Sequence, residues 1–69
     1  MLVDLCNTSK VKEFVAIAQS CVGDTTLKSG RYVVDGKSIL GIFSLDLSQP
    51  VELECENEKD YAAFSDFGL

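Results

Sequence analysis

Near its middle the chain carries the segment Lys37-Ser38-Ile39-Leu40-Gly41-Ile42-Phe43-Ser44-Leu45. Serine is a good helix N-cap because its hydroxyl accepts a hydrogen bond from an amide left free at the start of a helix. Ser38 therefore predicts a short helix that ends at about Phe43 or Ser44. Four of the next five residues are large and apolar. They cannot all face inward on so short a helix, so we expect part of it to be exposed.

Upstream of this segment, the pattern predicts a strand, a longer helix and a hairpin. Residues 1–5 are short and apolar, and we expect a strand there. Asn7-Thr8-Ser9 is a run of good N-cap residues, and a helical stripe of apolar residues follows as far as Gly23, a residue that often ends helices. The stripe consists of Val11, Phe14, Val15, Ala18 and Val22. Residues 25–28 and 31–34 are β-prone and meet at Ser29-Gly30, which indicates a hairpin.

Downstream of it, residues 51–55 alternate strictly between apolar and acidic side chains. Such alternation is typical of a half-buried strand with one wet face. Residues 57–67 have aromatic side chains at helical spacing behind Asn57 as a cap. The order β-α-β-β-α-β-α predicts an α+β fold, an open-faced sandwich in which three helices cover one face of a four-stranded antiparallel sheet. With 69 residues, we expect the chain 1–69 to form a single domain.

Composition argues against several classes of protein. Eleven acidic residues against six basic ones give a net charge of -5, which offers poor electrostatic support for nucleic-acid binding. No apolar run approaches the roughly 20 residues that cross a bilayer, and no basic leader precedes the first apolar segment. Three widely spaced cysteines without any histidine make a metal site improbable, and they favour reduced thiols in the cytoplasm. We expect no metal and no cofactor.

The order of elements and the segment 37–45 together resemble HPr, the histidine-containing phosphocarrier of the bacterial sugar phosphotransferase system (PTS). The resemblance runs without gaps over about residues 11–54 and is strongest at 37–45. In that family a motif close to glycine-leucine-histidine-alanine-arginine-proline begins the first helix. Extending the match backwards places Asn7 at the histidine position, Ser9 at the arginine and Lys10 at the proline. The chain thus resembles a divergent member without the active-site histidine.

The loss of histidine excludes phosphocarrier activity, and we expect no enzymatic activity. A phosphocarrier needs an imidazole nitrogen that forms a labile phosphoramidate, whereas the amide of Asn7 is neither basic nor nucleophilic. Only six residues precede Asn7, fewer than the family uses for its first strand and active-site loop. Either the strand is truncated, or the loop is shortened and residues 1–5 lead almost directly into the helix. We favour the second alternative, because a missing edge strand would expose the apolar face of the helix.

Ser38 matches the regulatory serine of the family, which a dedicated kinase phosphorylates. A histidine-free paralogue that keeps this serine, the catabolite-repression HPr-like protein, is similar in logic to the present chain. The resemblance implies a regulatory or adaptor protein with Ser38 as its phosphorylation site. It also implies an HPr kinase or a transcriptional regulator as the partner. The alternative interpretation is that Ser38 serves only as a helix cap.

The helix at residues 38–44 corresponds to the apolar docking surface of HPr. We therefore expect partner contacts from this segment, with Phe43 as the leading candidate for a hot spot. The expected contact residues are Lys37, Ile39, Leu40, Ile42 and Phe43. The same surface would also serve a weak homodimer. The alternative interpretation is a core helix with incidental exposure.

Two further hypotheses remain open. Cys6 lies beside the helix start at Asn7-Thr8-Ser9, so a small thiol-based or anion-binding protein is an alternative from another class. A degenerate paralogue without activity is the third. The acidic side chains of residues 52 and 54 alternate along a predicted strand, and we interpret them as a solvated face rather than as a catalytic pair.

Overall fold

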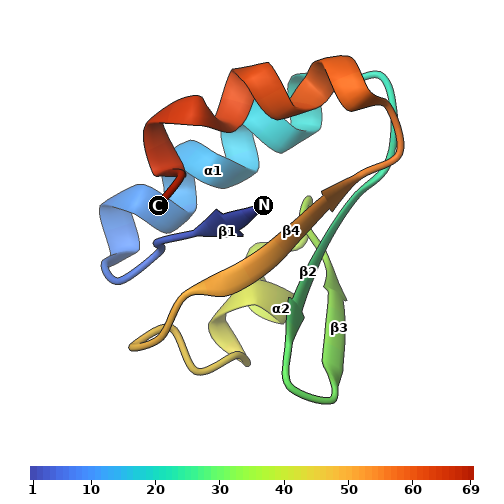
Figure 1. Ribbon diagram of the computed structural model, residues 1–69. Coiled ribbons are helices and arrows are strands. Elements are labelled where there is room, and N and C mark those ends of the chain that lie inside the picture. The colour runs from blue at the N-terminus through green and yellow to red at the C-terminus, as the bar shows by residue number, and fades with distance from the viewer.

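A computed structural model describes the whole chain, Met1–Leu69. Its strands form one four-stranded sheet in the order β1-β4-β2-β3, and every neighbouring pair is antiparallel (Figure 1). This order and three helices confirm the predicted fold class, and the topology is consistent with an HPr-like sandwich. The elements are β1 (Leu2–Val3), α1 (Thr8–Ser20), β2 (Thr25–Ser29), β3 (Tyr32–Asp35), α2 (Ile39–Phe43), β4 (Val51–Cys55) and η1, a 3-10 helix (Glu58–Phe67).

The sheet has one buried and one open face, as the alternation in β4 predicted. Val51 and Leu53 are buried, whereas Glu54 between Leu53 and Cys55 is exposed. On the open face Lys28 of β2 forms an ion pair with Glu54, with Nζ and Oε1 2.9 Å apart. Residues from all three helices join the single core on the other face. No helix is both long enough and apolar enough to cross a membrane.

Helix α1 begins at its predicted cap. Oδ1 of Asn7 accepts a hydrogen bond from the backbone N–H of Lys10 at 2.9 Å, which satisfies one of the amides left free at the helix start. The prediction that the helix continues to Gly23 was wrong, because it ends at Ser20. Gly23 is buried instead, and a Cβ on it would lie 3.2 Å from the backbone nitrogen of Asn57. This contact between distant segments requires the chain to leave the helix early, which leaves Val22 of the predicted stripe 92% exposed.

The C-terminal helix follows its predicted cap, since Oδ1 of Asn57 accepts from the backbone N–H of Lys59 at 3.0 Å. It is a 3-10 helix, which has three residues per turn. Tyr61, Phe64 and Phe67 are spaced by three and fit this period on one side of the helix. Phe64 and Phe67 are buried, and the hydroxyl of Tyr61 accepts from the backbone N–H of Cys55 at 3.0 Å.

The first strand is shorter than residues 1–5, because only Leu2–Val3 pairs with β4. The flanking residues are nevertheless held in place. The carbonyl of Met1 accepts from the N–H of Leu53 at 2.7 Å, and Leu5 is fully buried. The chain then passes from Leu5 through Cys6 and Asn7 into α1, so both the first strand and its connection to the helix are short.

The hairpin turn lies one residue later than predicted. Ser29 pairs with Tyr32, so Gly30 and Arg31 form the turn and β3 begins at Tyr32. Gly30 has φ of 58°. A glycine adopts this angle without steric cost, and a positive φ at the first central position is typical of the tight turns that match strand twist.

Phe14 lies at the centre of the core, with its ring centroid 4.6 Å from that of Phe64 and 5.8 Å from that of Phe67. We expect Phe14→Ala to lower the free energy of unfolding by about 3–5 kcal/mol, because it removes a large buried side chain and leaves a cavity. Denaturant unfolding followed by circular dichroism measures the change. Lys12→Ala, an exposed change on the same helix, is the control and should stay within about 0.5 kcal/mol. A loss for Phe14→Ala no larger than that of the control would contradict the assignment of the core.

Candidate functional site

Helix α2 is fixed to the end of β3 by a set of short hydrogen bonds. Oγ of Ser38 accepts from the backbone N–H of Gly41 at 3.2 Å, as the predicted N-cap requires. The backbone N–H of Ser38 donates to the carbonyl of Asp35 at 3.0 Å. The N–H of Lys37 donates to Oδ1 of Asp35 at 2.9 Å. Asp35 therefore sets the direction of the chain between β3 and α2, and Ser38 is an exposed residue at the start of the helix.

The apolar side chains of α2 divide between the core and the solvent. Ile42 is fully buried and Ile39 packs against the core. Leu40 is 82% exposed and Phe43 is 44% exposed. Residues three apart on a helix are neighbours on its surface, so Leu40 and Phe43 form one exposed apolar area, which we call the α2 surface.

This division narrows the set of expected contact residues. Ile42 is fully buried in the core, so a partner cannot reach it. The rotation of α2 about its axis relative to the sheet turns this side chain inward. Ile39 and Lys37 are half-buried and border the α2 surface. The sequence indicated that the helix carries more apolar residues than it can bury. It did not indicate which of them remain outside.

Two exposed apolar residues of β3 were not identified from the sequence. Tyr32 is 69% exposed and Val33 is 61% exposed, and both belong to the edge strand β3. A β-prone run does not by itself reveal whether its strand is central or at an edge. The predicted hairpin turn indicated that the two strands pair with each other. It did not indicate which of the two lies at the edge of the sheet.

The start of α1 contains the residues of the thiol and anion-binding alternative. Cys6 is a free, exposed thiol, and its backbone N–H donates to Oδ1 of Asp4 at 3.1 Å. Oδ2 of Asp4 also forms an ion pair with Nζ of Lys10 at 3.2 Å. Hydrogen bonding from Lys10, and secondarily from Cys6, holds the pKa of Asp4 below its ordinary value of 3.8. The same carboxylate raises the pKa of Lys10.

These contacts engage the polar side chains that an external anion would need at the start of α1. Asn7 already uses its side-chain oxygen as the cap, and the ammonium group of Lys10 is held by Asp4. Thr8 and Ser9 are exposed residues of the first turn of α1. The carboxylate of Asp4 thus lies next to the start of α1, where the anion-binding hypothesis would require an external anion.

The other two cysteines border the core. Cys21 and Cys55 are free and half-buried, and they pack against the apolar cluster. Burial raises the pKa of both thiols. A raised pKa keeps a thiol protonated and lowers its nucleophilicity, so we assign them to packing.

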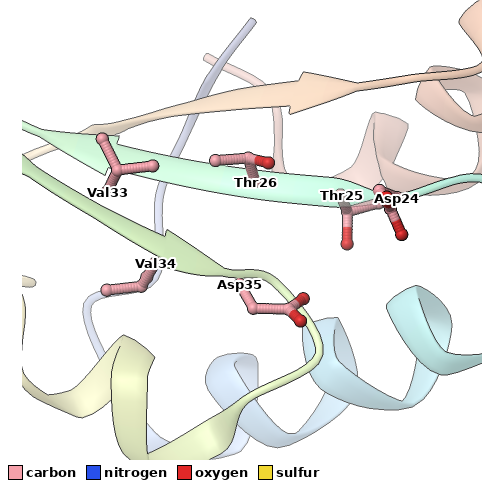
Figure 2. A pocket seen from close by; sticks show the side chains of 6 residues that line it. All are labelled: Asp24, Thr25, Thr26, Val33, Val34 and Asp35. Carbon is pink, nitrogen blue, oxygen red and sulfur yellow. The ribbon is translucent and has the colours of Figure 1, made fainter.

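A pocket of about 300 Å³ lies beside the start of β2 and the end of β3, which are neighbours in the antiparallel pair (Figure 2). Figure 2 shows the oxygens of Asp24, Thr25 and Asp35 toward the same end of the strand pair. Thr25 is 2% exposed, and its Oγ1 is buried without a hydrogen-bond partner. A Cβ on Gly36 would lie only 2.6 Å from that oxygen, so the close approach of the two strands depends on glycine at this position. The lining residues are Asp24, Thr25, Thr26, Val33, Val34 and Asp35.

We expect Thr25→Val to raise the free energy of unfolding by about 1 kcal/mol, because it replaces a buried hydroxyl that has no partner by a methyl group of similar shape. Denaturant unfolding of the variant and the wild type measures the difference. Thr26→Val, at the half-exposed neighbour, is the control for the effect of a β-branched apolar residue alone. A destabilised Thr25→Val would mean that the hydroxyl has a partner, and the pocket would then have a polar role.

Comparison with protein-family models, with curated proteins and with solved structures finds no match to this chain. What the structure establishes is a small α+β domain with a four-stranded antiparallel sheet and three helices.

Proposed function

We propose that this protein is a non-enzymatic regulatory or adaptor domain that binds a protein partner through the α2 surface. The proposal depends above all on one observation, the exposure of Leu40 and Phe43 side by side on a short helix whose other apolar residues are held in the core. Ile39 and Ile42 anchor the helix, so the exposed pair is presented on a fixed support. A rigid apolar surface of this kind is typical of a docking site.

The energetics favour burial of these two side chains in a complex. Covering a large apolar side chain contributes about 1.5–3 kcal/mol, and aromatic residues are over-represented among the residues that dominate binding. Lys37 and Ser38 at the border supply polar groups around the apolar centre. This arrangement of an apolar centre with a polar rim is the usual anatomy of a protein interface.

The resemblance to HPr supplies candidates for the partner. It suggests a regulatory protein of the bacterial PTS, and an HPr kinase or a transcriptional regulator as the protein that binds α2. Ser38 is exposed beside Leu40, so a phosphate there would add nearly two negative charges at the border of the α2 surface. Phosphorylation of Ser38 would thereby change which partners the surface accepts.

The rival hypotheses have weaker support. A thiol or anion-binding role at Cys6 has to compete with the carboxylate of Asp4, which accepts from the N–H of Cys6 and pairs with Lys10. A degenerate paralogue without activity gives no role to the adjacent exposure of Leu40 and Phe43 on an anchored helix.

We expect Leu40→Ser to weaken binding of a purified transcriptional regulator of the PTS by about tenfold or more, a loss of about 1.4 kcal/mol. Titration of the isotope-labelled protein with the regulator, followed by nuclear magnetic resonance, gives both the affinity and the residues affected. Shifts should be confined to residues 37–44 and their neighbours. Phe43→Ala should act in the same direction.

Val22→Ser is the matched control for this titration. Val22 is 92% exposed and lies in the connection between α1 and β2, outside α2. It should leave the affinity unchanged. An unaltered affinity in Leu40→Ser, or shifts centred on another face, would refute docking through α2.

A second experiment addresses Ser38. Incubation with ATP and a bacterial HPr kinase, followed by intact-mass spectrometry, should add one phosphate to the wild type and none to Ser38→Ala. Ser44→Ala, at the other end of α2, is the control and should gain the phosphate. No gain in the wild type would limit Ser38 to its role as a helix cap.

A further inference from the structure

The two edges of the sheet differ in how they are covered. The outer edge of β1 is paired with the C-terminal residues: Val3 forms a bridge with Gly68, and the N–H of Leu69 donates to the carbonyl of Leu2 at 3.2 Å. The outer edge of β3 has no neighbour. Edge strands are commonly protected by proline, by lysine or by a bulge. The residues of β3 are Tyr-Val-Val-Asp in an uninterrupted register, so none of these protections is present.

The register shows which backbone groups of β3 point outward. Facing residues of an antiparallel pair alternate between hydrogen-bonded and non-hydrogen-bonded positions. The N–H of Gly36 donates to the carbonyl of Thr25 at 2.9 Å, so Val34 and Tyr32 are the next residues that bond to β2. Val33 therefore directs both its N–H and its carbonyl away from the sheet. Asp35 directs its N–H outward.

We propose that a second copy of this chain adds to the β3 edge, as an antiparallel strand related by a two-fold axis at Val33. In this register Val33 of one copy faces Val33 of the other, and their outward N–H and carbonyl groups bond to each other. Tyr32 faces Val34. Arg31 faces Asp35. The two sheets become one continuous sheet with a self-complementary interface, as two-fold dimers require.

Charge and exposure favour a copy of the same chain as the occupant. Arg31 precedes β3 and Asp35 ends it, so an antiparallel self-pairing brings opposite charges together twice. The pocket at the Asp35 end also contains Asp24, which adds negative charge where a guanidinium group arrives. The pairing covers Tyr32 and Val33, which are 69% and 61% exposed in the single chain. A second copy always presents Arg31 opposite Asp35, whereas an unrelated extended segment would carry complementary charges only by chance.

The association is expected to be weak. Each copy carries a net charge of -5, which opposes the approach of a second copy. A four-residue strand also offers a small interface, and small interfaces are typical of transient complexes. The dimer should therefore depend strongly on protein concentration. Because the β3 edge and the α2 surface are formed by different residues, either proposal can fail without the other.

Sedimentation equilibrium over increasing concentration tests the proposal. The apparent mass should rise from the 7.5 kDa of one chain toward twice that value. Amide hydrogen exchange should slow with concentration at Val33 and Asp35 and stay unchanged at Val34, which already bonds to β2. A single chain at every concentration would overturn the proposal. So would an exchange pattern without this alternation.

Val33→Pro is the most selective variant, because it removes an outward N–H and no bond to β2. It should abolish the rise in mass while circular dichroism stays that of the wild type. Leu40→Ser is the matched control and should still associate. A dimer that survives Val33→Pro, or that is lost in Leu40→Ser, would place the contact elsewhere and refute the β3 register.

A charge exchange tests the register without proline. Arg31→Asp alone and Asp35→Arg alone should each weaken self-association by about tenfold, since like charges then face each other twice. An equimolar mixture of the two variants should associate again, because positions 31 and 35 carry opposite charges at both contacts of the mixed dimer. A mixture that remains dissociated, although both variants fold, would overturn the two-fold arrangement. Binding of a foreign extended peptide at β3 without self-association would overturn it as well.

Discussion

The contact between Phe14 of α1 and Phe64 of η1, with ring centroids 4.6 Å apart, holds the two ends of the chain together. It places η1 over the core, and the residues that follow Phe64 then cover the first strand: the carbonyl of Phe67 accepts from the N–H of Asp4 at 2.9 Å. The β1 edge is thereby covered, whereas the β3 edge has no neighbouring strand. In so small a domain, which buries a limited fraction of its surface, loss of the aromatic contact would affect the core and the covered edge together.

The features predicted correctly from the sequence are those that local chemistry determines. Asn7, Ser38 and Asn57 cap their helices because a short polar side chain can reach an amide two or three residues later whatever the surroundings. The alternation in β4 needs only a sheet with one buried face. The end of α1 was different, because Gly23 packs against Asn57. That contact joins segments far apart in the sequence, and no local pattern indicates it.

In the candidate site, too, some features follow from the local sequence and others from contacts between distant segments. An excess of apolar residues after Ser38 was visible in the sequence, and it correctly indicated partial exposure of the helix. The choice between Leu40 outside and Ile42 inside depends on how α2 is rotated against the sheet, which only the packed structure fixes. Exposure of Val33 follows from its position opposite Lys28, on the open face of the sheet. The pattern of one strand does not determine its neighbours.

Asp35 connects the two surfaces that the proposals concern. Its side chain accepts from the N–H of Lys37 and its carbonyl accepts from the N–H of Ser38, so it fixes the start of α2. Its own N–H points outward from the β3 edge. A phosphate on Ser38 would stand close in sequence to this carboxylate, and like charges repel through the short distance of a turn. Any event that moves Asp35 therefore acts on the edge and on the helix at once. The start of α2 and the outward edge of β3 therefore share this one residue.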